Sequence, residues 1–252
     1  MNLLTAFQKE FMEQRRTQRL LIAVVVLAVF GLLSPLLAKL TPQILTMVPG
    51  GEQIASLIPA PTVNDAIAQY IKNVSQFGVL LTLLFSMGAV AVEKDKGTAA
   101  MILSKPLPRG TFLLAKFLAV ALTLTLGMAA SALGGYYYTA ILFESLPVGA
   151  FLAMNGLLLL YMFVYAAITL FFSSITRTQF VAIGGAAGVL ILSGILSSLP
   201  TIGKYTPDAL IGISAQVALR QPVTNWWSSW ISMALILLAL VGSWLVFRKQ
   251  EL

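Results

Sequence analysis

Residues 93–110 read EKDKGTAAMILSKPLPRG and lie between two long apolar segments of the chain. These eighteen residues carry six charged side chains, whereas the flanking segments carry almost none. Gly97 and Thr98 are suited to open a short helix, and Pro106 and Pro108 are suited to stop it. The stretch therefore predicts a short helix between two membrane spans, outside the bilayer, where a second protein can contact it.

The composition of the whole chain indicates a membrane protein. The 252 residues are 58% hydrophobic and 10% charged, with a mean hydropathy of +0.90. The apolar runs are continuous rather than alternating, which favours helices over a barrel. The chain has no cysteine and no histidine, which excludes disulfides, Cys/His metal sites and nucleophilic sites built on those residues. We expect an all-α membrane protein that is not an enzyme and holds no cofactor or metal of its own.

Six apolar segments are long enough to cross a hydrocarbon core of about 30 Å, which needs about 20 residues. We expect the spans near residues 20–38, 74–92, 112–136, 148–172, 180–199 and 227–247. The one charged residue inside these segments is Lys116, about one helical turn from a predicted cytoplasmic end. A charge at the centre of a span costs about 2.5–3.5 kcal/mol on insertion scales, so this distribution supports the assignment.

The charges also predict the topology. Six spans place both termini on one side, and with the termini in the cytoplasm twelve of the sixteen Lys and Arg residues lie inside. This split fits the positive-inside rule, so the net charge of +7 is explained without nucleic-acid binding. Residues 41–73 and 200–225 are then expected to be outer loops broken by proline and glycine, and the second loop contains a short amphipathic stretch, 207–220.

Residues 1–19 predict an amphipathic elbow helix that lies in the cytoplasmic interface before the chain turns into the bilayer at Gln18 and Arg19. The apolar side chains that recur at helical spacing are Leu3, Leu4, Phe7, Phe11 and Met12. The opposite face carries Gln8, Lys9, Glu13 and Gln14. The alternative for these residues is a plain N-terminal tail. In either case, we expect residues 20–252 to form the six-span transmembrane domain.

The loop between the second and third predicted spans carries a family resemblance. Its motifs are Glu93-x-x-x-Gly97-Thr98, Leu103-Ser104-x-Pro106-x-x-Arg109 and Leu113-Leu114-x-Lys116-Phe117. Together with the elbow helix and the segment Ala60-Pro61-Thr62, they resemble the permease subunits of ABC-2-type transporters. The branch that looks similar contains the copper-site maturation permease of nitrous oxide reductase and the gliding-motility permeases. The similarity extends over essentially the whole chain.

The resemblance implies a type V, ABC-2 exporter-like fold in which the loop 93–110 holds a coupling helix that seats in a groove of an ATPase. We assign this helix to residues 97–104, with Glu93 and Arg109 as bracing charges. The residues that the resemblance assigns to ATPase coupling are Glu93, Gly97, Thr98, Met101, Leu103, Lys105, Pro106, Arg109 and Lys116. Those that it assigns to the elbow helix are Phe7, Phe11 and Met12.

The chain lacks a phosphate-binding loop, because the sequence Gly203-Lys204 has no preceding glycine at the required spacing. By the resemblance, ATP and Mg are bound by two copies of a partner ABC ATPase, and a second permease subunit completes the transporter. A homodimer is favoured, and a heterodimer stays open. The expected location is the cytoplasmic membrane of a bacterium or archaeon, where the chain contacts lipid and no nucleic acid.

Small residues predict close helix contacts in two of the spans. The fifth contains Gly184-x-x-x-Gly188, and the third contains Gly127-x-x-x-Ser131. Such spacing lets two helix backbones approach closely, either within one chain or across a dimer. We expect packing within the chain at both motifs.

The sequence is compatible with three functions. The first is a permease subunit of an ABC exporter. The second is a mechanotransmission subunit of an ABC complex, which passes ATPase work to a periplasmic or surface partner. The third is an ion-coupled carrier, which the lack of ionisable side chains inside the spans disfavours. The sequence identifies neither the cargo nor the partner.

Overall fold

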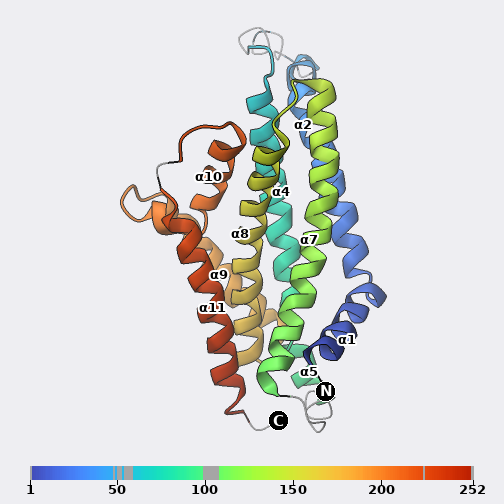
Figure 1. The fold of residues 1–252 in the computed structure, drawn as a ribbon, viewed down its shortest axis with the longest axis vertical. Coiled ribbons are helices and arrows are strands. Elements are labelled where there is room, and N and C mark those ends of the chain that lie inside the picture. The colour runs from blue at the N-terminus through green and yellow to red at the C-terminus, as the bar shows by residue number, and fades with distance from the viewer. Residues whose placement is uncertain are drawn as a thin grey trace.

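The structure is a computed structural model that describes residues 2–47, 49, 53, 59–98, 108–223 and 225–250. Within these ranges the regular elements are helices. They are α1 (Leu3–Arg16), α2 (Arg19–Thr46), α4 (Val63–Ser86), α5 (Ala91–Asp95), α7 (Arg109–Leu142), α8 (Val148–Ile175), α9 (Gln179–Ser197), η1 (Gly203–Tyr205), α10 (Ala209–Ala218) and α11 (Trp227–Phe247). Figure 1 shows them as an elongated bundle with both chain ends at the same end of the molecule.

Six spans are long and apolar enough to cross a membrane, which confirms the predicted all-α membrane fold. They are α2, α4 together with α5, α7, α8, α9 and α11. The bounds of α8, α9 and α11 lie within three residues of the predicted ones, whereas α2, α4 and α7 are longer than predicted. The predicted stretch 207–220 contains the short helix α10.

The prediction that residues 41–73 form an irregular loop was wrong at both ends. Helix α2 continues to Thr46, and α4 begins at Val63. The early start of α4 has a local cause, because Thr62 and Asp65 form a capping box. The Asp65 carboxylate accepts hydrogen bonds from the Thr62 backbone N–H and hydroxyl, both at 2.8 Å.

Helix α2 contains two prolines, Pro35 and Pro42, without ending at either. A proline inside a helix removes one backbone hydrogen bond, and hydroxyl side chains help to tolerate it in membrane helices. Each of these prolines follows a residue whose hydroxyl donates to a carbonyl one turn earlier. Ser34 donates to Phe30, and Thr41 donates to Leu37.

Helices α2, α4, α7 and α8 form the core of the bundle. Glycines bring α2 and α7 close together, because a Cβ built on Gly31 would lie 2.5 Å from the Ser131 carbonyl oxygen. A Cβ on Gly127 would lie 3.0 Å from the Ala23 carbonyl oxygen. The predicted packing of Gly127 and Ser131 within the chain is therefore confirmed.

A neutral polar network crosses the core in its outer half. The Tyr70 hydroxyl donates to Asn155 Oδ1 at 2.6 Å and lies 3.1 Å from the Ser131 hydroxyl. The Asn73 amide donates to the Ser34 hydroxyl at 3.0 Å. These bonds connect α4 to α2, α7 and α8 without any charged group.

Helices α9 and α11 are the peripheral spans, and both contact the bundle mainly through α8. They have 19 and 21 residues, about 29 and 32 Å at 1.5 Å per residue, which is one hydrocarbon thickness. Helix α7 has 34 residues, so it is about 20 Å longer. Figure 1 shows the outer ends of α2, α4 and α7 beyond that of α11. These core helices therefore extend beyond one hydrocarbon thickness at the end away from the chain termini, which the charge distribution predicts to be the outer side.

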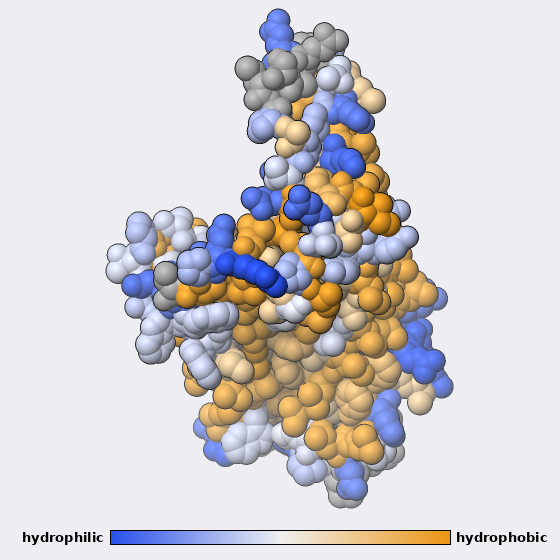
Figure 2. Space-filling view, turned by 45° about the horizontal axis from the view of Figure 1, so that its top comes forward, coloured by the Kyte–Doolittle hydropathy of each residue, from blue (hydrophilic) through white to orange (hydrophobic). Residues whose placement is uncertain are grey.

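The surface agrees with this placement. In Figure 2 hydrophobic residues cover the body of the molecule, and hydrophilic residues gather over the projecting end and over a lobe beside it. Large apolar side chains are exposed along α9 and α11, among them Phe180, Ile191, Ile195, Leu237 and Leu238. In a membrane this surface contacts lipid or another subunit.

Candidate functional site

The candidate site lies at the end of the bundle that holds both chain termini, where α1 crosses α7. Helix α1 packs through Ala6, Glu10 and Gln14, which are buried at a spacing of four residues. Gln14 was predicted on an exposed-type polar face with Gln8, Lys9 and Glu13, opposite the apolar side chains, but it lies in the buried stripe with Ala6 and Glu10. The reason is that α1 rests on α7 through a narrow, partly polar stripe.

The predicted elbow residues point away from that stripe or lie at its edge. Phe7 and Phe11 stack with their ring centroids 6.0 Å apart, and both are partly buried. Met12 is 49% exposed, and Leu4 is 66% exposed. Exposed apolar side chains on one face of α1 fit a helix that lies in the membrane interface.

Lys116 is the centre of a buried ion-pair cluster. Its side chain is 4% exposed, and its ammonium group lies 2.9 Å from Glu10 Oε2 and 2.9 Å from Glu93 Oε1. The same ammonium lies 4.8 Å from the centroid of the Phe112 ring. An uncompensated charge at this depth would be costly, and the two carboxylates compensate it. Lys116 thus joins α1, α5 and α7 at one point.

Lys9 completes the cluster from the solvent side. Its ammonium lies 3.0 Å from Glu10 Oε1 and 3.6 Å from Glu93 Oε1. Burial opposes charge on Glu10, but Lys116 and then Lys9 outweigh it, so the pKa of Glu10 lies below its usual range. Burial also opposes charge on Lys9, but Glu10 and Glu93 outweigh it and raise the pKa of Lys9. Both groups are therefore charged at neutral pH.

Three carboxylates approach each other in this cluster. Oxygens of Glu10, Glu13 and Glu93 lie within 4.8 Å of one another, a spacing that a metal ion would tolerate. Two ammonium groups, from Lys9 and Lys116, already pair with Glu10 and Glu93. The arrangement is therefore that of an ion-pair network rather than of a ligand set for a divalent cation.

The second span is interrupted between α4 and α5, and side chains from other helices bind the freed backbone groups. The Ser173 hydroxyl oxygen accepts hydrogen bonds from the N–H groups of Val90 and Ala91, both at 3.0 Å. Arg19 Nη1 lies 3.4 Å from the carbonyl oxygen of Phe85. These bonds hold the interruption in place, and α5 beyond it carries Glu93 to Lys116.

Arg109 braces a different element from Glu93. Its Nη1 donates to the carbonyl oxygen of Phe247, the last residue of α11, at 2.6 Å and to that of Gln250, just beyond the helix, at 2.8 Å. The Gln250 amide in turn donates to the carbonyl oxygen of Ser174 on α8, at 3.1 Å. The two ends of the loop 93–110 are therefore tied to α1 and α7 on one side and to α11 on the other.

The loop itself is described only at its ends. Gly97 has φ +67°, a left-handed conformation that favours glycine, and no atom of the described residues lies within 4 Å of a Cβ built there. The Thr98 hydroxyl donates to the carbonyl oxygen of Glu93 at 3.2 Å. The predicted helix and its remaining coupling residues lie outside the described residues: Met101, Leu103, Lys105 and Pro106. Their role stays a prediction.

The expectation that Gly184 and Gly188 pack within the chain was wrong. A Cβ built on either glycine would contact nothing within 4 Å, whereas one on Gly185 would lie 2.6 Å from the Phe172 ring. The reason is that α9 turns Gly185, not the motif glycines, toward α8. The motif lies on a face that no described part of the chain covers.

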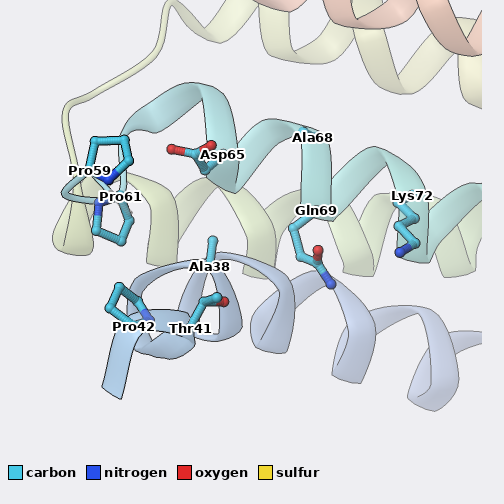
Figure 3. Close-up of a pocket in the computed structure, with 9 residues that line it drawn as sticks. All are labelled: Ala38, Thr41, Pro42, Pro59, Pro61, Asp65, Ala68, Gln69 and Lys72. Atoms are coloured by element: carbon cyan, nitrogen blue, oxygen red, sulfur yellow. The ribbon is translucent and has the colours of Figure 1, made fainter. Parts of the chain in front are cut away.

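A second concave region lies at the projecting outer end. It is a groove of about 440 Å³ between α2 and the start of α4. Figure 3 shows Pro42 on one wall and Pro61 on the other. Its charged side chains are Asp65 and Lys72. The Asp65 carboxylate is already used to cap α4. The groove is therefore better suited to contact with another molecule than to catalysis.

Sequence reasoning missed Glu10, Lys9 and Ser173 as parts of the site. One signal pointed to the first two, because a lysine inside an apolar span requires a counterion. Glu10 lies in the one amphipathic segment that precedes the spans. Nothing in the sequence pattern distinguishes Ser173 from other serines of the spans.

Comparison with known proteins gives two findings. Residues 4–252 match the family described as ABC-2 family transporter protein. The chain is also 24% identical over 258 residues to YxlG, an uncharacterized transmembrane protein of Bacillus subtilis strain 168, with 99% of this chain and 98% of that protein aligned. Both similarities extend over nearly the whole length of the chain.

Proposed function

The chain belongs to the ABC-2 family of transporter proteins, and from this membership we propose that it is the permease of an exporter whose separate ATPase docks on residues 93–110. Membership makes it a membrane subunit that works with an ABC ATPase. The direction of transport, the docking site and the subunit count are the parts that we propose. ATP and Mg would be bound by two copies of the ATPase.

The observation that carries this proposal is the Lys116 cluster. It joins the elbow helix, the end of the second span and the start of the third at the point where the loop 93–110 leaves the bundle. Work from a soluble motor must enter a membrane domain through rigid contacts. A loop that hung freely between two spans would absorb such a push, whereas this one is held at Glu93 and at Arg109.

These contacts define how a push on the loop would reach the spans. Displacement of Glu93 moves Lys116 with α7, and through Lys116 it moves Glu10 with α1. Displacement of Arg109 pulls on the carbonyls at the end of α11. ATP binding by the partner would thus shift several elements together and favour one of two states, inward-facing or outward-facing.

We further propose that two copies of this chain form the transporter. The face of α9 that carries Gly184 and Gly188 is open, and large apolar residues flank it. Small residues at this spacing let helices of two subunits approach closely. A heterodimer with a related permease would use the same face.

The test is co-purification of the tagged chain from its host in mild detergent, with partners identified by mass. We expect a stoichiometric ABC ATPase. Replacing residues 97–104 with a glycine–serine linker of equal length should release it, whereas replacing the outer loop 143–146 in the same way should not. Recovery of the chain alone in repeated mild extractions, with its function intact, would overturn the proposal and favour an ion-coupled carrier.

A mechanotransmission subunit is the second candidate, and the projecting helices favour it. Helices α2, α4 and α7 extend beyond the outer ends of α9 and α11 and present the groove of Figure 3. In that case a bound outer partner would change the ATPase rate without movement of a solute. Shortening residues 41–62 should then abolish partner binding while the basal ATPase rate persists. If no outer partner binds and a solute crosses the membrane, this candidate is excluded.

A further inference from the structure

A polar pocket lies at the outer membrane interface, apart from the ATPase-facing end. It has a volume of about 380 Å³ and is formed by η1, α10 and residues next to α9 and α11. The outer end of α9 and the start of α11 mark this boundary, because each helix spans about one hydrocarbon thickness. Trp226, Trp227 and Trp230 are 46%, 60% and 65% exposed beside it, as interfacial tryptophans are.

Asp208 is the acidic group of this pocket, and it is unusually placed. It stands at the N-cap of α10 but makes no capping hydrogen bond there. Instead, Oδ1 accepts a hydrogen bond from the Tyr161 hydroxyl at 3.3 Å, and Oδ2 accepts one from the Ser193 hydroxyl. The carboxylate is thus held between α8 and α9, and Asp208 is one of the residues that line the pocket.

The negative charge of Asp208 has no ion-pair partner among the described residues. Lys204 also lines the pocket, but its ammonium lies 5.1 Å from the centroid of its neighbour Tyr205. Neutral hydroxyls hold this carboxylate at the wall of a polar pocket, and no cation pairs with it among the described residues, so it can serve as the counterion of a cationic ligand.

We propose that this pocket binds a primary ammonium group, with Asp208 as its counterion and the side-chain oxygens of Gln216 and Asn225 as neutral acceptors. Both residues line the pocket, and Asn225 Oδ1 is fixed because it accepts the Trp227 N–H at 2.8 Å. A primary ammonium offers three donors around a compact charge, which suits one carboxylate and two amide oxygens. The inference does not depend on the ATPase or on the direction of transport.

Other cations fit less well. A divalent metal ion prefers several carboxylates, and this pocket has one. A guanidinium binds both oxygens of a carboxylate side by side, but hydroxyls already occupy a position on each oxygen of Asp208. A quaternary ammonium prefers a cage of aromatic faces, and the aromatic residues line the adjoining pocket of about 720 Å³ instead.

The ammonium group can come from two sources, the ethanolamine headgroup of a phospholipid or a water-soluble amine. The full chain is therefore placed in nanodiscs of phosphatidylglycerol, which has no amine. Binding of ethanolamine is followed by saturation-transfer NMR, with choline as the comparison. In parallel, native mass spectrometry measures which lipid the protein retains from a mixture of phosphatidylethanolamine and phosphatidylglycerol.

We expect the wild-type protein to bind ethanolamine in preference to choline, or to retain phosphatidylethanolamine in preference to phosphatidylglycerol. Retention of the lipid alone would identify a headgroup site, and binding of free ethanolamine would identify a site for soluble amines. Asp208→Asn should weaken binding by about tenfold or more, because it removes the charge but keeps the shape. Glu144→Gln removes a carboxylate from an outer loop and should bind as wild type.

A second variant keeps the test decisive if Asp208→Asn does not fold. Gly212 lines the pocket, and a Cβ built on it would contact none of the described residues within 4 Å. Gly212→Leu should therefore fill the pocket, leave the fold intact and abolish binding. If the wild type prefers neither ligand, or if both pocket variants bind as well as the wild type, the proposal is wrong.

Discussion

The two ends of the core are held together in different ways. At the end that holds both chain termini, the predicted cytoplasmic end, Lys116 pairs with Glu10 and Glu93, and three elements meet at that charge. In the outer half, Tyr70 bonds to Ser131 and Asn155 without any charged group. The close approach of Gly31 on α2 to Ser131 on α7 adds to this half.

This difference matches the work proposed for each end. Hydrogen bonds between neutral groups respond little to pH or salt, so they hold the helices in position under all these conditions. An ion-pair cluster is costly to break by removing one partner, because the remaining charge stays buried. It therefore makes the elements that it joins move as a unit. The charged end is the one that faces the proposed ATPase.

Lys116→Met should have the largest effect, and it tests whether the ion-pair cluster holds its end of the core together. The variant leaves Glu10 and Glu93 buried without their main counterion, so we expect a loss of about 3–5 kcal/mol in the free energy of unfolding. Unfolding in mixed detergent micelles measures it. Adding Glu10→Gln to Lys116→Met should recover part of the loss. A single variant as stable as wild type would mean that the cluster does not hold the cytoplasmic end.

The outer half is tested by Gly31→Ala. The added Cβ would lie 2.5 Å from the Ser131 carbonyl oxygen, a backbone atom that cannot move aside alone. We expect a loss of about 1–3 kcal/mol from overpacking, measured in the same micelles. Gly156→Ala is the matched control, since its Cβ meets nothing within 4 Å. Equal stability of the two variants would contradict close packing of α2 on α7.

Tyr70→Phe sharpens the contrast between the two kinds of network. It removes the hydroxyl that joins Ser131 and Asn155 while keeping the ring, and we expect a loss of about 1–2 kcal/mol. Tyr137→Phe serves as the control, because Tyr137 is 61% exposed and should change stability little. The loss at Tyr70 should be the same at pH 7 and at acidic pH. A pH-dependent loss would show that charge reaches the outer half.

The smallest expected effect is the pH dependence of the cytoplasmic end. The pKa of Glu10 is lower in the folded protein than its usual value of 4.5. Its stabilising contribution is therefore complete above pH 4.5 and is lost as the pH falls through the folded pKa. The stability difference between wild type and Glu10→Gln, measured at neutral and acidic pH, should shrink at acidic pH. A constant difference would refute the ion pair with Lys116.

Much of the fold was predictable from the sequence, because apolar run length decides membrane spans. The lengths of α2 and α4 were harder to predict. Pro42 suggested that α2 ends there, but the helix continues through this proline. Helix α4 starts early because of the Thr62–Asp65 capping box, which lies directly after the proline-rich segment 59–61. The site was predictable in part. Lys116 was visible as a charge in a span, but its partner Glu10 lies 106 residues away in the chain. The acceptors of Arg109 are backbone carbonyls, which no side-chain pattern marks.

The central claim is that a separate ATPase contacts the loop 93–110. A photo-crosslinking amino acid placed at Met101 tests it directly in membranes of the native host, with Thr46 at the outer end of α2 as the matched position. The account predicts a crosslink to an ABC ATPase from position 101 and none from position 46. Absence of the ATPase from the products at position 101, or equal crosslinking from both positions, would contradict it.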